Sequence, residues 1–175
     1  MEREFIMIKP DGVQRNLVGE VISRIEKIGF KIVAMKFHKV TMEQAEKHYE
    51  IHKERPFYKG LLEYITSGPV VSMIIEGKDA VKITRKIVGA TNPADAEPGS
   101  IRGDHALEIG RNIIHAADSP ENAIMEYKIY FKDDEIQSYE RIDEDWIYEW
   151  YTKYYLFLHF CKKRMNCEKS QFIIF

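Results

Sequence analysis

The sequence predicts an α+β domain in which helices pack against a sheet. Three runs rich in apolar, β-branched and aromatic residues have the length of buried or half-buried strands: Phe5–Ile8, Phe30–Val40 and Val70–Ile75. Segments with helical periodicity separate these runs along the chain. At 175 residues, the chain is long enough to bury a core as one main domain. This alternation favours a layered sandwich of helices and strands.

The first strand ends at a turn signal. Phe5–Ile8 is followed directly by Lys9-Pro10-Asp11-Gly12. Proline cannot donate to a sheet ladder, and Pro-Asp-Gly is typical of turns. We therefore expect this strand to bring Lys9 to the end of the sheet.

Five helices are predicted, and local signals mark where most of them begin or end. Apolar residues recur at helical spacing between Leu17 and Ile28, and Gly29 suits the position just after a helix. The capping box Thr41–Gln44 begins a helix that should reach about Lys53. The other three are expected over Leu61–Ile65, over Ala80–Val88, and from Pro120 to about Tyr130 with Ser119 as its N-cap.

A fourth strand is expected to end at Ile113–Ile114, just before His115. With this strand, the order of elements matches a ferredoxin-like βαββαβ sandwich, a four-stranded antiparallel sheet with helices on one face. The preceding segment, Thr91–Ile101, is a loop by composition. Its length of about eleven residues is unusual in a compact domain and indicates a functional loop.

Composition and charge separate the chain into a body and a tail. The net charge is −2, which argues against a polyanion-binding role for the whole chain. Residues 150–175 carry +4, which leaves −6 for residues 1–149. We expect residues 1–149 to form the catalytic domain and residues 150–175 to be a basic, aromatic extension. The only cysteines, Cys161 and Cys167, lie in that extension.

No targeting or membrane-spanning segment is expected. The charged start Met1–Glu4 and the short apolar run after it do not form a signal peptide. No run reaches the roughly eighteen apolar residues of a transmembrane helix. Cysteine-free residues 1–149 suit a reducing compartment, so we expect a cytoplasmic protein.

Two common phosphate-binding motifs are missing from the sequence. Neither the P-loop pattern nor the glycine-rich dinucleotide fingerprint occurs. If this chain binds nucleotides, side chains must hold the phosphates. The cationic candidates near turns are Lys9, Arg85, Arg102 and Arg111. Arginine matches phosphate oxygens with two parallel donors, and lysine acts as a compact charge.

His115 is the best candidate for a nucleophile. A neutral imidazole is nucleophilic near pH 7 and can form a covalent intermediate. It needs a partner on its other nitrogen, for which Glu126 is a candidate, whereas Asp118 more plausibly serves the turn. The alternative is a structural, partly buried histidine. Arg102 and Asn112 nearby favour the functional interpretation.

Other histidine and cysteine patterns carry less weight. His48 and His52 are four residues apart on a predicted helix, but they lack the pattern of a zinc protease, so a solvated helix face is expected. The spacing of His159, Cys161 and Cys167 matches no standard metal site. Phe57 is expected to be ordinary core, with a stacking platform for a base as the alternative.

The segment Asn112–Ser119 resembles the active-site signature of nucleoside diphosphate kinases. Five further segments resemble that family in its order and at its spacings, and the resemblance extends over residues 1–149. These segments are Ile8–Gly12, Arg55–Phe57, Ser67–Val71, Thr91–Asp95 and Gly99–Asp104.

The resemblance implies transfer of a γ-phosphate from a nucleoside triphosphate to a nucleoside diphosphate, with Mg²⁺. It implies a ping-pong mechanism through a phosphohistidine, and assembly as a homo-hexamer or homo-tetramer. His115 would be the nucleophile, and Glu126 would bond its other ring nitrogen. The nucleotide would be bound at the phosphates by Lys9, Arg85, Thr91 and Arg102 with Tyr49 nearby, at the ribose by Lys9 and Asn112, and at the base by Phe57, Leu61 and Ile109. No residue is implied as a metal ligand.

Three departures from the family pattern matter. His105 stands where the family often has phenylalanine, which predicts a change in packing or in a subunit contact. Ala117 stands where the family usually has a serine that supports the glutamate near the histidine. Loss of the one neutral hydrogen bond that this serine would make should cost about 1 kcal/mol, which corresponds to a roughly fivefold lower rate. The chain also continues for residues 150–175, beyond the usual family length. Two other functions remain open: nucleotide binding with little catalysis, and binding of nucleic acid or a membrane surface through the basic tail.

Overall fold

A computed structural model describes residues 1–149 of the chain. It divides into two units, Met1–Ser138 and Tyr139–Phe175, which we treat separately. The predicted extension, residues 150–175, lies outside the described residues. In the described part of the second unit, helix α8 spans Glu144–Ile147, and Arg141 Nε donates to Asp143 Oδ1 at 2.8 Å.

The first unit is built on a four-stranded antiparallel sheet. Its strands are β1 (Glu2–Ile8), β2 (Lys31–Lys39), β3 (Pro69–Gly77) and β4 (Ile114–Ala116), arranged in the order β2-β3-β1-β4. β1 lies between β3 and the short edge strand β4, where Met7 pairs with His115. The sheet confirms the predicted α+β fold, and it places His115 within the fourth strand rather than just after it.

One face of the sheet is covered by the two helices of the βαββαβ unit, α2 (Val18–Lys27) and α5 (Ala80–Val88). Side chains alternate between the faces of a strand, so Ile6 and Ile8 point from β1 to this side. They form a core with Met73 and with residues of both helices. Helices on this face are what the sequence predicted.

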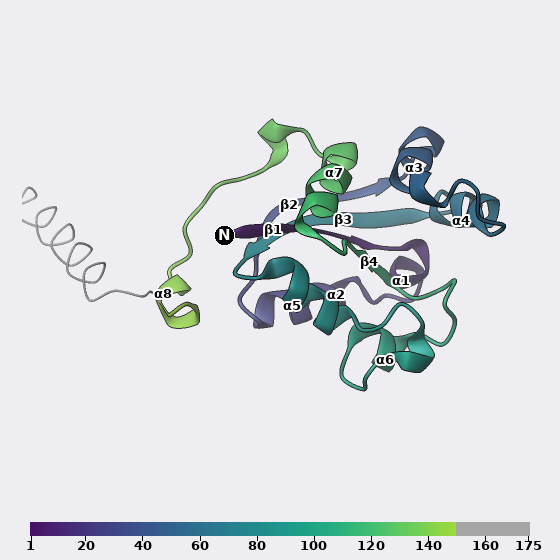
Figure 1. Cartoon of the computed structure of the whole chain (residues 1–175). Coiled ribbons are helices and arrows are strands. Elements are labelled where there is room, and N and C mark those ends of the chain that lie inside the picture. The colour runs from purple at the N-terminus through teal and green to yellow at the C-terminus, as the bar shows by residue number, and fades with distance from the viewer. Residues whose placement is uncertain (150–175) are drawn as a thin grey trace, which may run out of the picture. The chain divides into compact units, whose positions relative to one another are not determined.

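The opposite face is covered as well. Phe5 and Met7 of β1 pack there against α3 (Met42–His48), α4 (Tyr58–Ile65) and α7 (Pro120–Tyr130). Figure 1 shows these three helices on the side of the sheet opposite to α2 and α5. The sheet therefore has helices on both faces, because its central strand is apolar on both sides.

Several short elements differ from the sequence predictions. The turn after β1 is a short helix, α1 (Pro10–Gln14), since proline is well suited to the first helical position. The helix expected to reach Lys53 ends at His48 and continues as the 3₁₀ turn η1 (Glu50–His52), and α4 begins earlier than expected, at Tyr58. The loop after α5 contains η2 (Pro93–Asp95), α6 spans Ile101–His105, and η3 spans Asp133–Glu135.

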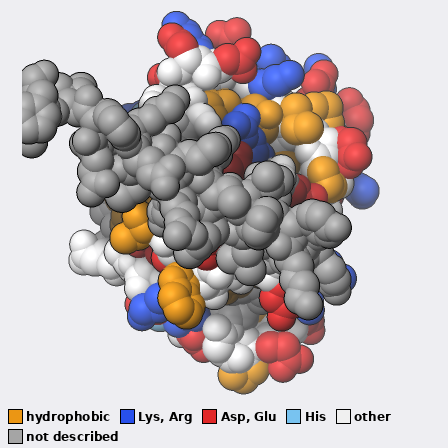
Figure 2. Space-filling view, turned by 90° about the vertical axis from the view of Figure 1, so that its left-hand side faces the viewer, with side chains coloured by type: hydrophobic (Ala, Val, Ile, Leu, Met, Phe, Trp, Pro, Cys, Tyr) orange, Lys and Arg blue, Asp and Glu red, His pale blue; other side chains and the backbone are white. Residues whose placement is uncertain are grey.

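None of the described helices is both long and apolar enough to cross a bilayer. Where described residues are visible in Figure 2, acidic and basic side chains are interspersed with apolar ones on that face.

Candidate active site

The candidate site lies where the ends of β1 and β4 meet α5, α6 and α7. Lys9 follows β1, and its main-chain N–H donates to the carbonyl of Ile113 at 2.8 Å, just before β4. This link holds two segments together that are about a hundred residues apart in the sequence. It brings the predicted lysine to the same end of the sheet as His115.

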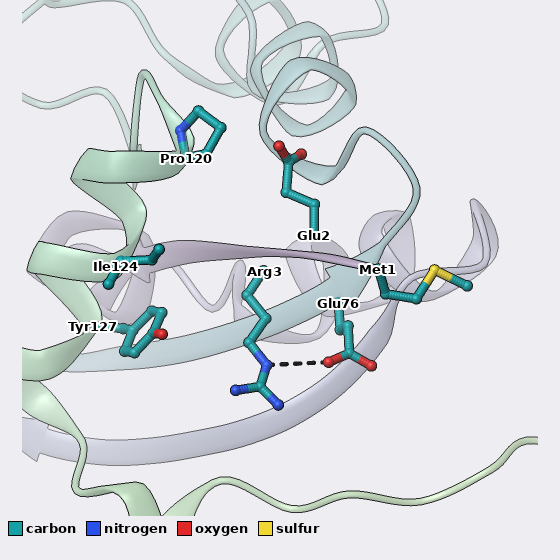
Figure 3. Close-up of a pocket in the computed structure, with 7 residues that line it drawn as sticks. All are labelled: Met1, Glu2, Arg3, Glu76, Pro120, Ile124 and Tyr127. Carbon is teal, nitrogen blue, oxygen red and sulfur yellow. Dashed lines mark hydrogen bonds and ion pairs between the residues drawn. The ribbon is translucent and has the colours of Figure 1, made fainter.

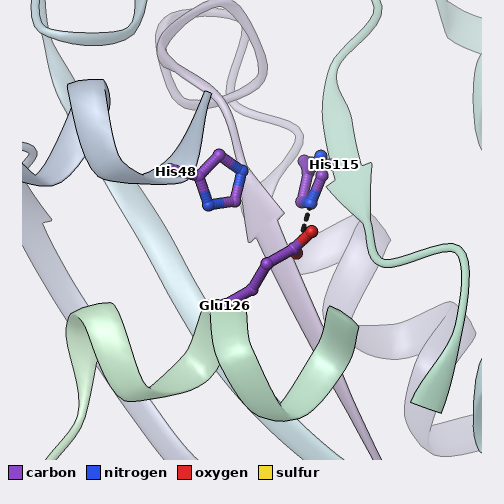
Figure 4. Close-up of side chains that lie close together, drawn as sticks. All are labelled: His48, His115 and Glu126. Atoms are coloured by element: carbon purple, nitrogen blue, oxygen red, sulfur yellow. Dashed lines mark hydrogen bonds and ion pairs between the residues drawn. The ribbon is translucent and has the colours of Figure 1, made fainter. Parts of the chain in front are cut away.

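His115 and Glu126 are in direct contact. His115 Nε2 lies 2.6 Å from Glu126 Oε2, so β4 and α7 present the two groups to each other (Figure 4). An ionised carboxylate can only accept a hydrogen bond, so it favours the tautomer with the proton on Nε2. That tautomer leaves the Nδ1 lone pair free. The pairing predicted from the sequence is present.

The surroundings keep the His115 imidazole neutral. Burial is the main cause that lowers its pKa to about 3, and the charges of Lys9, Arg102 and Arg85 act in the same direction. Burial raises the pKa of Glu126 to about 7. The contact is therefore a hydrogen bond to a neutral ring at physiological pH, not an ion pair. A neutral ring is the nucleophilic form.

The Lys9 ammonium and the Asn112 amide form a buried pair beside His115. Lys9 Nζ donates to Asn112 Oδ1, and Asn112 Nδ2 donates to the carbonyl of Thr91 at 2.7 Å. Burial, then the charge of Arg102, lowers the pKa of Lys9 to about 8. The long loop that contains Thr91 is thus tied to the end of the sheet, as its predicted role requires.

Arg102 is only 3% exposed, and its guanidinium is fixed by main-chain carbonyls. It donates to Gly89 at 3.0 Å and to Ile114 at 2.7 Å, with a longer bond to Asn112 at 3.3 Å. Burial lowers its pKa to about 10. A guanidinium has five N–H groups, so two remain for another ligand.

Arg85 comes from α5 and lies on the other side of β4. One of its terminal nitrogens, Nη1, is 3.4 Å from the carbonyl of Ala116, the residue after His115. It also lines a shallow pocket between α5 and the loop before α6, together with Gly89 and Ser100. The Arg85 side chain therefore reaches both the strand that contains His115 and the open pocket.

The residue before β4 has a strained main chain. Ile113 is β-branched yet has φ of 71°, a conformation that such residues rarely adopt. Asp11 Oδ2 accepts from its N–H at 3.0 Å, and Asp11 also accepts from the Tyr64 hydroxyl. A Cβ atom at Gly12 would lie 2.8 Å from Ile8 Cγ2 and 3.0 Å from the Ile113 carbonyl oxygen, so any larger residue would have to displace its neighbours. The sequence analysis assigned Asp11 only to a turn, and the Pro-Asp-Gly pattern was the available signal.

His48 is buried, which contradicts the prediction of a solvated helix face. It is 8% exposed, and its ring centroid lies 4.6 Å from that of His115. Neither ring nitrogen has a hydrogen-bond partner among the described residues, and burial lowers its pKa to about 3. The prediction failed because α3 packs its last turn against β1 and α7. Of the pair, only His52 remains partly exposed.

His48, His115 and Glu126 place three possible ligand atoms within 4.8 Å of one another. Two observations argue against a metal ion there. The charges of Lys9 and Arg102 act on His115, and Arg85 acts on both His115 and Glu126. The His115 nitrogen and the Glu126 oxygen are already bonded to each other. We therefore interpret the cluster as one that orients the His115 ring.

Tyr49 follows α3 and is buried against His48. Its ring centroid lies 4.5 Å from that of His48, almost perpendicular to it. Burial raises the pKa of its hydroxyl, so this group stays protonated. Tyr49 is therefore linked to His115 through the ring of His48, which contacts both.

The residues expected to hold a base are more exposed. Phe57 is 56% exposed, so the prediction that it belongs to the core is wrong and the alternative, an exposed platform, remains. Ile109 is also exposed, whereas Leu61 is partly buried on α4 and packs against the core. The Phe57 ring lies 5.6 Å from that of His52, beside the turn that follows His48.

A second shallow pocket lies at the start of β1 and α7. Met1, Arg3, Glu76 and Ile124 are among its lining residues, and Arg3 forms an ion pair with Glu76 at 3.1 Å (Figure 3). It shares no lining residue with the His115 site.

Comparison with known proteins agrees with this geometry. The family model described as nucleoside diphosphate kinase matches residues 2–136. A nucleoside diphosphate kinase from Archaeoglobus fulgidus is 60% identical over 149 residues, which are 85% of this chain and 99% of that protein. One from Methanosarcina mazei is 59% identical, over 85% of this chain and all of its own length.

Solved structures are similar in fold. A halophilic nucleoside diphosphate kinase from Halobacterium salinarum, in complex with CDP, has a TM-score of 0.83 and 44% identity. The match covers 85% of this chain and 99% of that one. A nucleoside diphosphate kinase family protein from Babesia bovis also has a TM-score of 0.83, with 45% identity, over 85% of this chain and all of its own.

Proposed function

We propose, for a chain that belongs to the nucleoside diphosphate kinase family, that His115 is the residue that carries the phosphate. The chain is a phosphotransferase. It transfers the γ-phosphate of a nucleoside triphosphate to a nucleoside diphosphate by a ping-pong mechanism through a phosphohistidine, and so maintains NTP and dNTP pools. The observation that supports His115 is a neutral imidazole bonded to Glu126, with three cations near it.

In the first half-reaction, the Nδ1 lone pair of His115 attacks the γ-phosphorus. A P–N bond forms, the bond from phosphorus to the bridging oxygen breaks, and the nucleoside diphosphate leaves with that electron pair. Glu126 stabilises the positive charge that develops on the ring. In the second half-reaction, a terminal oxygen of another diphosphate attacks the phosphohistidine, and the lone pair returns to Nδ1.

The phosphates are bound by Lys9, Arg85, Thr91 and Arg102, with Tyr49 near them. Arg102 is held by main-chain carbonyls, so its two remaining donors need no reorganisation to meet an anion. Phosphoryl transfer demands mainly positioning and charge stabilisation from a protein. Buried cations that are already in place meet that demand.

The nucleoside is bound by groups at the edge of the site. Lys9 and Asn112 contact the ribose hydroxyls, and the base stacks on Phe57 in a slot lined by Leu61 and Ile109. The exposure of Phe57 supports a stacking platform. Stacking does not read base edges, so this arrangement accepts purines and pyrimidines alike.

Mg²⁺ is the proposed cofactor, and the site fits an ion that arrives with the nucleotide. The described residues near His115 are mostly cationic, so phosphate oxygens and water would be its principal ligands. Asp118 is exposed, and its charge acts on both His115 and Glu126, so it would hold the hydrated ion. The bound ion neutralises phosphate charge.

We also propose that the protein is a homo-oligomer, a hexamer or tetramer, in the cytoplasm. β2 is an edge strand whose Met35 and Phe37 side chains are exposed, and such edges are usually covered in native proteins. The cytoplasm is where the nucleotide pools that the enzyme serves are found.

Incubation with γ-labelled ATP tests the role of His115. The wild-type protein should acquire an acid-labile, base-stable phosphate that unlabelled nucleoside diphosphate removes. His115→Ala should acquire none, while His105→Ala, which removes another histidine, should be labelled normally. Label on the His115→Ala protein, or none on the wild type, would reject the proposal.

A further inference from the structure

Glu4 is an ionisable residue in the buried core, where an apolar side chain is usual. It belongs to the central strand β1 and is 0% exposed. It is the first residue of the buried run that continues to Ile8. Its Oε1 accepts a hydrogen bond from the N–H of Ala117 at 2.7 Å. Its Oε2 has no hydrogen-bond partner among the described residues. A carboxyl group buried in this way needs a reason, because its burial is costly.

The partner of Glu4 lies just after the nucleophile. Ala117 is two residues past His115, and its N–H also reaches the carbonyl of Phe5 at 3.2 Å. Its own side chain has no polar atom and packs with Val81 and Ala123. Within the described chain, Glu4 is therefore the side chain that anchors the main chain at this position.

Charged groups face Glu4 from three elements: Glu2 on β1, Glu126 on α7 and Arg85 on α5. Burial raises the pKa of Glu4 to about 9, and both glutamates act in the same direction. The bond from Ala117 and the charge of Arg85 act in the opposite direction. Glu4 thus keeps its proton at neutral pH and ionises as the pH rises through about 9.

We propose that Glu4 is a positioning residue for His115 that works as an uncharged carboxylic acid. It holds the main chain after β4 while leaving Glu126 as the carboxylate that bonds the imidazole. A second anion beside Glu126 would raise the pKa values of Glu126 and His115 and so favour the protonated ring, which is not nucleophilic. The proposal rests on the proposed role of His115.

Two substitutions of Glu4 test separately whether its hydrogen-bond acceptor and its uncharged state matter for the reaction of His115. Glu4→Gln keeps the shape, the acceptor and a neutral group, so it should phosphorylate His115 within about twofold of the wild-type rate. Glu4→Leu keeps the bulk but loses the acceptor, so the rate should fall roughly fivefold, as for one neutral hydrogen bond. ADP affinity should be unchanged in both variants, because the hydrogen bond of the Glu4 side chain is made to the main chain of Ala117 and not to a proposed nucleotide ligand.

Glu2 offers a matched control on the same strand. It also accepts a main-chain hydrogen bond, from Val81 at 2.8 Å, but α5 rather than the nucleophile segment is its partner. Glu2→Leu should therefore leave the phosphorylation rate near the wild-type value. Equal rates for Glu4→Leu and wild type would overturn the proposal, as would a Glu4→Gln protein as slow as Glu4→Leu.

The pH dependence gives a readout that a purely structural role would not move. Wild-type rates should fall above pH 9 as Glu4 ionises, in addition to any loss from Lys9, whose pKa is about 8. In Glu4→Gln, the decrease in rate caused by deprotonation of Lys9 should remain, and the decrease caused by ionisation of Glu4 should be absent. Its rate should therefore fall less steeply above pH 9 than the wild-type rate. An identical fall in both proteins would overturn the proposal.

Infrared difference spectra test the protonation without catalysis. The spectrum of wild type minus Glu4→Gln at pH 7 should contain the carbonyl band of a protonated carboxylic acid, and this band should disappear above pH 9. Absence of the band at pH 7 would overturn the proposal even if His115 is phosphorylated normally. If His115 is not phosphorylated, the proposed function fails whatever the infrared result.

Discussion

Individual residues around His115 set the charge state on which the chemistry depends. Three cations and the surrounding protein keep its ring neutral, while Glu126 takes the hydrogen bond on Nε2. The ring of His48 packs against it from the other side. The His115 ring is thus oriented by several contacts before any nucleotide binds.

The first prediction at this scale concerns the carboxylate. Glu126→Gln should slow phosphorylation of His115 by roughly tenfold to a hundredfold, because it replaces a charge-assisted hydrogen bond of about 1.5–3 kcal/mol. Rapid-quench labelling with ATP measures the rate. Glu121→Gln, an exposed position on the same helix, should react like wild type. A wild-type rate for Glu126→Gln would show that the bond is dispensable.

The second prediction at this scale concerns the stability of the folded protein at acidic pH. Burial lowers the pKa of His48 to about 3 in the folded protein, from an ordinary value of about 6.5 in the unfolded chain. Below pH 6.5 the unfolded chain therefore binds a proton that the folded chain does not, and stability should fall as the pH drops from 6.5 towards 3. The slope should be at most about 1.4 kcal/mol per pH unit for this residue.

Denaturant unfolding between pH 7 and pH 4 measures this effect. His48→Phe should show a smaller loss of stability across that range than wild type. His52→Phe, at a position where water already reaches the ring, should behave like wild type. Equal pH dependence for wild type and His48→Phe would contradict the burial argument.

At the scale of elements, short connections between helices and strands build the site. α1 and the segment before β4 are joined by Asp11, which holds Ile113 in its strained conformation. The turn from α3 through η1 to α4 carries Tyr49 inwards and Phe57 outwards. The connection between α3 and α4 therefore places Tyr49 in the buried part of the site and Phe57 at its exposed edge.

One prediction belongs to that turn. Phe57→Ala should weaken ADP binding by roughly five- to a hundredfold, since stacking on an aromatic ring contributes about 1–3 kcal/mol per base. The melting temperature should change little, because the ring is largely exposed. Equilibrium titration with ADP and with CDP checks both the loss and its independence of the base. Ile51→Ala, an exposed apolar position in η1, serves as the control. Unchanged affinity would rule out the stacking platform.

At the scale of the whole molecule, the sheet has two different edges. β4 is short and contains His115, whereas β2 has nine residues and exposes Met35 and Phe37. An apolar edge of this kind favours association between copies of the chain. The site and the expected subunit contact therefore lie at opposite edges of the sheet.

Sedimentation velocity tests this arrangement. The full chain should sediment as an assembly several times heavier than its 20.6 kDa. Phe37→Glu should shift the distribution towards smaller species, because it places a charge on the exposed edge. Ile51→Glu introduces the same charge at an exposed apolar position elsewhere and should leave the distribution unchanged. A monomeric wild-type protein would contradict the proposal.

The local patterns in the sequence were sufficient for most of the longer elements but not for the short helices α1 and α6. The spans of α5 and α7 agree with the prediction, as do the positions of the three longer strands, because periodicity and capping residues act over a few neighbours. The motifs also identified the family correctly, as the comparisons confirm.

Contacts between distant segments could be decided only by the tertiary structure. The sequence pattern did not reveal that His48 faces inwards, that Phe57 stays exposed, or that Ile113 is held at positive φ. The bond from Ala117 to Glu4 joins residues 113 positions apart. Such contacts depend on how whole helices and strands pack against one another. Sequence patterns that extend over a few neighbouring residues do not determine that packing.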